Sequence, residues 1–223
     1  MLSSYSFIIQ WNRNSKIDTV VCLGGEDVEI SEHDQWLELI THDDAQELEN
    51  APEHILADKD FMIKAVKRNG FALKYASDDA IIAMADDVEK FSTITEIARR
   101  KARHAKAQVL LKRGDEAAAM TVFKVLSAEV KSAEGAEARY RVIEQEYKAK
   151  QYDKAEKMVY EFSDSNTPQN YWLAKAFILL GDIYLDRGDS FQARATYQSV
   201  VDGYSPADDG IVELAKSKIS KMN

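Results

Sequence analysis

Groups that could hold a metal ion or move a proton are gathered between residues 32 and 44. This segment contains Glu32-His33-Asp34 and, further on, His42-Asp43-Asp44. Imidazole and carboxylate groups are common metal ligands. Acidic residues also begin helices, because a carboxylate caps the first turn and favours its positive end. We favour the second interpretation and predict no bound metal and no cofactor, with a metal-dependent enzyme using this segment as an alternative.

Nucleophiles and phosphate-binding loops give no stronger indication of catalysis. The single cysteine, Cys22, lies in an apolar run, where we expect a small buried residue and not a reactive thiol. The chain has no Gly-x4-Gly-Lys-Ser/Thr loop and no Gly-x-Ser-x-Gly motif. One cysteine also excludes an internal disulfide framework. We therefore expect a protein that is not an enzyme.

Charge is distributed unevenly along the chain. The formal net charge is −9, and residues 26–90 contain 18 acidic and 6 basic residues. An acidic face repels phosphate, so we expect no nucleic-acid partner. We interpret most of this charge as a solvated surface that keeps the protein in solution.

The strongest local charge feature is a basic patch, which comprises Arg99, Arg100, Arg103 and Lys106. On a helix, these side chains and their basic neighbours would surround most of the circumference. Three interpretations stay open: a patch that attracts an acidic segment or a terminal carboxylate, a contact with the acidic first half of this chain, or an ordinary solvated face.

The sequence predicts no membrane-spanning helix. No window holds eighteen consecutive apolar residues, and the start MLSSYSFIIQW lacks the features of an export signal. We expect a cytoplasmic protein, or one in the cell envelope if an export signal has been removed.

Three stretches in the second half of the chain repeat one pattern of two amphipathic runs joined by a short turn. They begin at Ala102, Ala138 and Lys175. A small residue recurs on each second run, spaced 36 and 38 residues apart, as Ala119, Ala155 and Ala193. An apolar residue follows one turn later, as Phe123, Val159 and Tyr197. Proline follows two of the units, at Pro168 and Pro206.

This pattern resembles the tetratricopeptide repeat, a helical hairpin that stacks on its neighbours. The last unit matches best, with Leu180-Gly181, Tyr184 and a Gly188-Asp189 turn. The middle unit departs from the pattern, with Lys150-Gln151 in place of the Gly-Asp turn. The resemblance implies an all-α fold, a right-handed solenoid of hairpins over residues 80–206.

A half unit and a final helix would complete this array. The half unit contains Ala80 and Met84, with Ala80 lying 39 residues before Ala119. Residues 207–223 read as a capping helix. Its inward side chains are predicted to be Ile211, Val212, Leu214, Ala215 and Ile219.

The first part of the chain has a different organisation. Residues 46–79 contain a shorter repeat, in which Leu48, Ala51 and Glu53 correspond to Leu73, Ala76 and Asp78. With a helix before Asn69-Gly70, this region resembles a family of short helical repeats of unknown function. Residues 1–45 read as a β-hairpin, from Tyr5–Trp11 and Ile17–Leu23, and a short helix over residues 32–41.

The resemblance to tetratricopeptide repeats also implies where a partner would bind, because first-helix residues line the concave face of such arrays. By position, these are Lys101, His104, Gln108, Leu111, Tyr140, Glu144, Tyr147, Ile178, Asp182 and Leu185. Tyr140 and Tyr147 are either anchors for a partner or part of the packing between repeats. The clustered lysines and asparagines that bind chaperone C-termini are missing, which makes that ligand doubtful.

We interpret the chain as a non-catalytic scaffold or adaptor that binds a peptide or helix of another protein. Similar arrays often serve in bacterial assembly complexes, an analogy at the level of fold. The alternative is a structural subunit that self-assembles as a homo-oligomer, or stabilises a larger complex, through its acidic first half and its basic first repeat helix.

Overall fold

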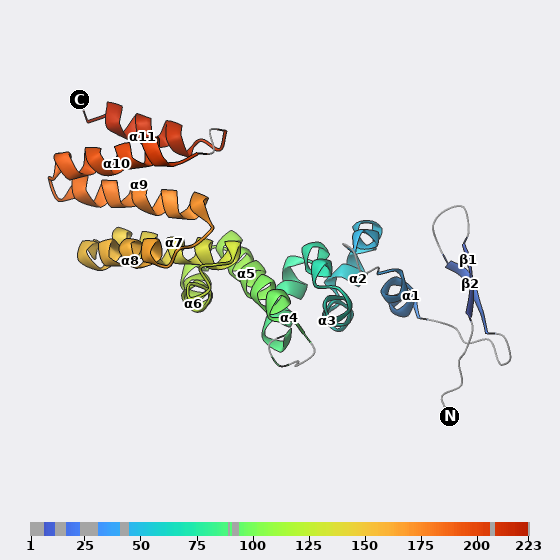
Figure 1. Ribbon diagram of the computed structural model, residues 1–223. Helices are drawn as coiled ribbons and strands as arrows, with labels where there is room; N and C mark the ends of the chain where they lie inside the picture. Colours follow the sequence, from blue (N-terminus) through green and yellow to red (C-terminus); the bar gives the residue numbers. More distant parts are fainter. Residues whose placement is uncertain are drawn as a thin grey trace. The chain divides into compact units, whose positions relative to one another are not determined.

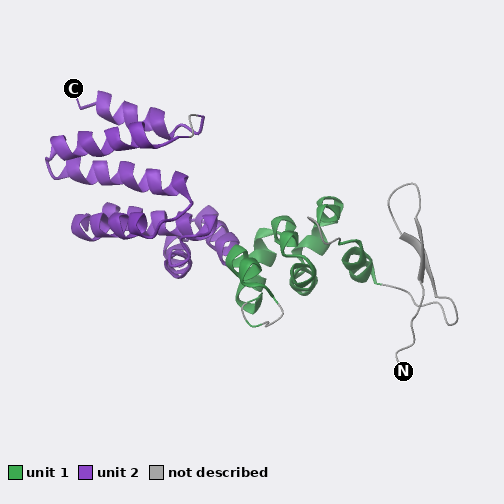
Figure 2. Ribbon diagram, viewed as in Figure 1, with its two compact units in different colours: residues 1–102 green, residues 103–223 purple. Residues whose placement is uncertain are grey.

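The computed structural model describes residues 7–11, 17–22, 31–40, 45–88, 90, 94–205 and 208–222. Two compact units divide the chain, residues 1–102 (unit 1) and residues 103–223 (unit 2) (Figure 2). The boundary falls within helix α5, Glu96–Lys112. The boundaries predicted from the sequence, at residues 45, 79 and 206, lie where the type of repeat changes. The two compact units are instead defined by contacts between residues. The all-α fold predicted from the sequence is confirmed by the helices of both units.

Unit 1 begins with two short antiparallel strands, followed by helix α1. Strand β1, Phe7–Trp11, pairs with β2, Ile17–Cys22, and the register is irregular between Gln10 and Trp11. Helix α1 spans Glu32–Leu39, and its N-cap Ser31 accepts a hydrogen bond from the backbone nitrogen of Asp34. A hydroxyl at this position satisfies a backbone donor that has no partner inside the helix.

The shorter repeat of residues 46–79 has a clear structural basis in unit 1. Each copy is a 3₁₀ helix followed by an α-helix: η1 (Gln46–Asn50) and α2 (Glu53–Ala57), then η2 (Gly70–Tyr75) and α4 (Asp78–Val88). Leu48 and Leu73 are buried at equivalent positions. The backbone nitrogens of Ala51 and Ala76 donate to the carbonyls of Leu48 and Leu73, respectively.

Helix α3, Lys59–Arg68, lies between the two copies. Asp58 caps its start by accepting a hydrogen bond from the backbone nitrogen of Phe61 at 2.7 Å. Asn69 ends it and accepts from the backbone nitrogen of Phe71 at 2.9 Å. A Cβ atom at Gly70 would lie 3.2 Å from Cβ of Ala98, so a small residue suits this turn. The predicted stop at Asn69-Gly70 is therefore confirmed.

After the end of α5, unit 2 continues as a series of consecutive helices. They are α6 (Glu116–Leu126), α7 (Ala133–Lys148), α8 (Tyr152–Asp164), α9 (Asn170–Asp186), α10 (Ser190–Gly203) and α11 (Ile211–Ser220). Of these, α9, α10 and α11 lie side by side (Figure 1). Helix α7 contacts both α8 and α9, while α10 contacts α9 and α11. Each hairpin thus packs against the next, because a lone hairpin leaves an apolar face uncovered.

The recurring small residues form the close contacts of this stack. Ala119, Ala155 and Ala193 are fully buried, each with a relative exposure of 0%. The residues one turn later, Phe123, Val159 and Tyr197, are equally buried. In the half unit of unit 1, Ala80 and Met84 are buried as well. The predicted core positions of the repeats are therefore confirmed.

The three hairpin turns of unit 2 share one backbone geometry. Gly114, Lys150 and Gly188 have φ angles of 81°, 56° and 81°, and the backbone nitrogen of each donates to the carbonyl three residues earlier. The following residue donates to the carbonyl five residues earlier. This is the arrangement of a helix end closed by a left-handed residue. The middle turn therefore keeps its form although its sequence departs from Gly-Asp.

Helix α11 covers the last hairpin, but one of its predicted inward residues points outward. Ile211 and Ala215 are buried, and Ile219 packs on the same cluster. Leu214 is 43% exposed, so its prediction as an inward residue is wrong. Helix α11 has ten residues and buries only the narrow face, with Ile211, Ala215 and Ile219, that meets α10 and α9. Leu214 precedes Ala215 by one residue, so its side chain lies beside this face and not within it.

Candidate functional site

The predicted partner residues of unit 2 lie on the first helices of successive hairpins, and the structure brings two of them to one carboxylate. His104 Nε2 lies 2.9 Å from Glu137 Oε2 across α5 and α7. Gln108 Nε2 donates to Glu137 Oε1 at 2.9 Å. The imidazole also makes a T-shaped contact with the ring of Phe123, which is part of the core.

Glu137 is the centre of a charged network on this face. Arg141, one turn along α7, donates from its Nη2 to Glu137 Oε1 at 3.2 Å. Burial alone would raise the pKa of Glu137, but the hydrogen bonds from His104 and Gln108 and the charges around it lower the pKa to about 2. The carboxylate therefore remains charged at neutral pH.

A second cluster lies where α7 meets α9. The ring centroids of Tyr140 and Trp172 are 5.7 Å apart. Lys175 Nζ lies 4.5 Å from the centroid of the Tyr140 ring and 4.9 Å from that of Trp172. The Tyr140 hydroxyl donates to Glu144 at 3.0 Å, and Lys148 pairs with the same carboxylate at 3.0 Å. This cluster combines aromatic surface with the positive charge of Lys175 and an ion pair between Lys148 and Glu144.

We define the first-helix face as the half-buried side chains of these two clusters: His104, Gln108, Glu137, Arg141, Glu144, Trp172 and Lys175. Sequence reasoning missed Glu137, Arg141, Trp172 and Lys175. Glu137 and Lys175 occupy the position that Lys101 holds in the first unit, so the same line extended one turn earlier would have found them. Arg141 and Trp172 gave no such signal.

Three predicted partner residues make structural contacts within unit 2. Tyr140 and Ile178 are 8% and 4% exposed, so both side chains belong to the packing between helices. Tyr140 is thus core, one of the two interpretations left open by the sequence. Asp182 accepts a hydrogen bond from the hydroxyl of Tyr197 at 2.6 Å and pairs with Lys218 of α11 at 2.6 Å. This carboxylate ties the final helix to the last hairpin.

The other predicted residues of unit 2 lie at the ends of the first helices. The Tyr147 hydroxyl donates to Asp186 at 3.0 Å, and burial together with that hydrogen bond raises the pKa of Tyr147 to about 12. Leu111 packs against the cluster of α6, whereas Leu185 is 40% exposed. Of these three side chains, Leu185 is the most exposed.

Lys101 belongs to unit 1, where its Nζ lies 4.2 Å from the centroid of the Phe71 ring. The basic patch on α5 is engaged in ion pairs. Arg99 pairs with Glu96 at 3.2 Å, and Arg103 pairs with Glu129 at 3.5 Å. Arg100 and Lys106 also have interaction partners. Two of its guanidinium groups, those of Arg99 and Arg103, therefore compensate carboxylates of the chain itself.

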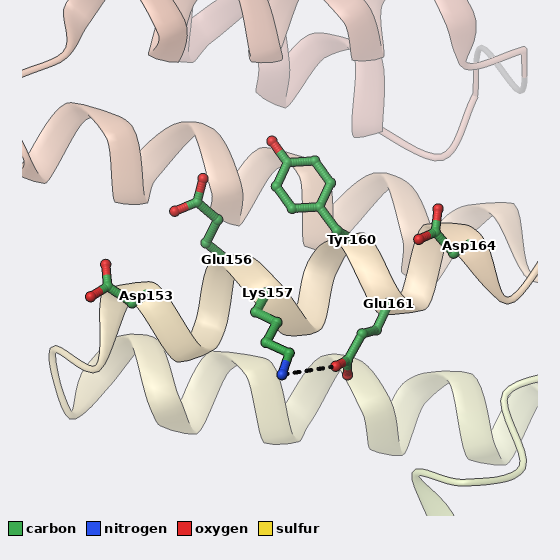
Figure 3. Close-up of a pocket in the computed structure, with 6 residues that line it drawn as sticks. All are labelled: Asp153, Glu156, Lys157, Tyr160, Glu161 and Asp164. Carbon is green, nitrogen blue, oxygen red and sulfur yellow. Dashed lines mark ion pairs between the residues drawn. The ribbon is translucent and has the colours of Figure 1, made fainter.

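Among the surface depressions of the described residues are two in unit 2. The larger, of about 460 Å³, is lined by Asp153, Glu156, Lys157, Tyr160, Glu161 and Asp164. All six belong to α8, and Lys157 pairs with Glu161 at 3.8 Å (Figure 3). The smaller, of about 340 Å³, lies between α9 and α10, and its apolar lining includes Leu173, Phe177 and Tyr204. A depression bordered by one helix gives a ligand few directions of contact.

No group of three or more potential metal ligands occurs among the residues that the structure describes. His42, Asp43 and Asp44 of the acidic cluster lie outside those residues, as does the side chain of Cys22. Within the described ranges, no helix is long and apolar enough to cross a membrane.

Fold and site together define unit 2 as an array of stacked helical hairpins with a polar and aromatic face. Residues 37–79, which lie in unit 1, match the family model "Domain of unknown function (DUF4116)". The predicted resemblance to a family of short helical repeats of unknown function is thereby confirmed for this segment. Neither a curated protein nor a solved structure matches the chain.

Proposed function

We propose that the hairpins of unit 2 are tetratricopeptide repeats and that α11 is their cap. The buried alanines on α6, α8 and α10 and the shared geometry of the three turns support this assignment. The contacts of α7 with α9 and of α8 with α9 follow the order in which such repeats stack.

The function that this architecture favours is that of a scaffold or adaptor without catalytic activity. It would bind a peptide or helix of another protein across the first-helix face. The observation that carries the proposal is the half-buried line of charged and aromatic side chains on adjacent first helices, from His104 and Glu137 to Trp172 and Lys175. Such a surface provides aromatic anchors surrounded by polar contacts.

Peptide selection followed by mapping of the contact tests this function. Peptides selected from a random display library on the full chain would be measured for binding by fluorescence anisotropy. A photo-crosslinking amino acid would then replace Lys148 on α7 or Leu185 on α9, both of which are exposed. We expect the selected peptides to crosslink at these positions.

The matched control positions lie on second helices. Val125 of α6 and Phe191 of α10 are 58% and 81% exposed, and we expect little crosslinking there. Crosslinking at Val125 or Phe191 but not at Lys148 or Leu185 would place binding on another face. Failure of every selected peptide to bind in solution would contradict the scaffold function itself.

A further inference from the structure

Lys175 has an unusual environment for a lysine on a helix. Three aromatic rings surround its ammonium group, with Nζ at 4.5 Å, 4.9 Å and 5.6 Å from the ring centroids of Tyr140, Trp172 and Tyr171. The faces of aromatic rings attract a cation, so the rings hold the ammonium in place. Its position is therefore set by packing between α7 and α9.

This cation has no carboxylate partner in the described part of the chain, although two carboxylates lie near it. The carboxylate of Glu137 already makes hydrogen bonds with His104, Gln108 and Arg141. Glu144 accepts hydrogen bonds from Tyr140 and Lys148. Burial, together with the positive charge of Arg141, lowers the pKa of Lys175, and the negative charges of Glu144 and Glu137 offset this lowering only in part. No carboxylate of the described residues therefore pairs directly with the ammonium group.

From this juxtaposition, we propose that Lys175 and its three rings recognise a glutamate side chain within a partner peptide. The inference rests on the proposed function, since it names the class of partner for the same face. The carboxylate of the glutamate would pair with the ammonium of Lys175. An apolar residue beside the glutamate would pack on Tyr171, which is 39% exposed, and on Trp172.

The geometry favours an internal glutamate over a C-terminal carboxylate. An arginine binds a carboxylate through two parallel hydrogen bonds, but Nε and Nη2 of Arg141 both donate to Glu137 already. Lys175 remains as a single point charge among apolar rings. A glutamate matches this site because its methylene groups can lie on the rings while its carboxylate reaches the ammonium.

Three synthetic peptide pools with randomised apolar flanks test the inference on the full chain. The first carries a central glutamate and an amidated C-terminus, the second a central glutamine and an amidated C-terminus, and the third a central glutamine and a free C-terminal carboxylate. We expect the best binders of the first pool to bind about tenfold more tightly than their glutamine counterparts. Fluorescence anisotropy measures the dissociation constants.

Substitution of the lysine identifies the group that reads the charge. Lys175→Met keeps much of the packing on the rings and removes the charge, so we expect the preference for glutamate over glutamine to disappear. Lys175→Arg should retain a preference, because the charge remains over the rings. Lys157→Met, on α8, removes a lysine that is 77% exposed and should leave the preference unchanged. Circular dichroism melts would verify that each variant is folded.

The outcomes separate this inference from the function on which it rests. Peptides that crosslink at Lys148 or Leu185 but bind equally with glutamate and glutamine would overturn the inference and leave the scaffold function intact. A preference that survives in Lys175→Met, or binding restricted to the third pool, would also overturn it. If no pool binds while peptides selected from the random library still crosslink at Lys148 or Leu185, the inference fails and the scaffold function stands.

Discussion

Close packing at single residues sets the tolerance of unit 2 to substitution. Gly181 of α9 faces the ring of Tyr197, and a Cβ atom at this glycine would lie 2.3 Å from the nearest ring carbon. Tyr197 is fully buried and donates to Asp182, so its ring has little freedom to move. Burial and the contact with Asp182 also raise the pKa of Tyr197. Glycine is thus required here by a neighbouring side chain.

We predict that Gly181→Ala lowers the free energy of unfolding by about 1–3 kcal/mol, because it overpacks a close helix contact. Urea denaturation followed by circular dichroism would measure the loss. Gly203→Ala is the matched control, since nothing lies within 4 Å of a Cβ atom at that position. The control should be neutral or slightly stabilising, because alanine favours the helix. Equal effects of the two substitutions would contradict the packing argument.

A second residue-scale prediction concerns the response of stability to pH. The pKa of Glu137 falls from its ordinary 4.5 to about 2 in the folded chain. A lowered pKa contributes stability that is present above about 4.5 and is lost as the pH falls toward 2. We expect Glu137→Gln to lower the free energy of unfolding at neutral pH and to flatten its decline through this window.

Denaturant titrations of Glu137→Gln at several pH values would check this behaviour. Glu161→Gln is a suitable comparison, because Glu161 pairs with Arg139 but is 49% exposed, where solvent weakens an ion pair. If Glu137→Gln kept the full acid dependence of the parent chain, the network around Glu137 would not be its source.

At the scale of elements, the turn between α7 and α8 has the same backbone geometry as the other two hairpin turns but a different sequence. Lys150 adopts a φ of 56°, where its counterparts are Gly114 and Gly188. A side chain at positive φ costs about 1 kcal/mol relative to glycine. Asp115 and Asp189 cap the helices after the other turns, whereas Gln151 makes no side-chain cap.

We predict that Lys150→Gly raises the free energy of unfolding by about 1 kcal/mol, because it relieves the left-handed residue. Gly188→Lys, the reverse change in the next hairpin, should destabilise by a similar amount. Thermal or urea denaturation measures both. A loss of stability in Lys150→Gly would show that the lysine side chain contributes more than the backbone geometry costs.

Neighbouring repeats are also joined through the loops that connect their hairpins. Lys131 donates to the carbonyls of Ser165 and Asn166 at 2.7 Å each. The hydroxyl of the buried Thr167 donates to the carbonyl of Val130 at 2.6 Å. The bonds from Lys131 satisfy carbonyl groups just after the end of α8, and the bond from Thr167 satisfies a carbonyl in the loop between α6 and α7. The loops therefore help to fix one hairpin on the next.

At the scale of the whole molecule, the scaffold function and the self-assembling alternative differ in the mass of the particle. A scaffold that binds a separate peptide needs no second copy. An assembly held by the acidic first half and the basic patch would dissociate as salt screens its charges. We expect light scattering to give the mass of one chain at low and at high salt. An oligomer that dissociates as the salt concentration rises would favour the alternative.

Much of the fold followed from local sequence patterns. The spacing of Ala119, Ala155 and Ala193 predicted a fully buried line, because a small residue at a fixed period indicates a repeated close contact. Asn69-Gly70 predicted the end of α3, because both residues suit a tight turn. Such signals are local, so they can be recognised without knowledge of which helices meet.

Tertiary contacts decided the role of each residue that the sequence pattern places on the binding face. Tyr140 and Asp182 share the periodicity of a binding face, yet Trp172 covers the first and Lys218 pairs with the second. These partners are distant along the chain, and no local pattern assigns them. The same holds for Lys175, whose three rings come from two helices. The sequence alone determined the helices and their repeat. Only the packing of one helix on another decided which side chains remain available to a partner, because burial depends on neighbouring helices and not on periodicity.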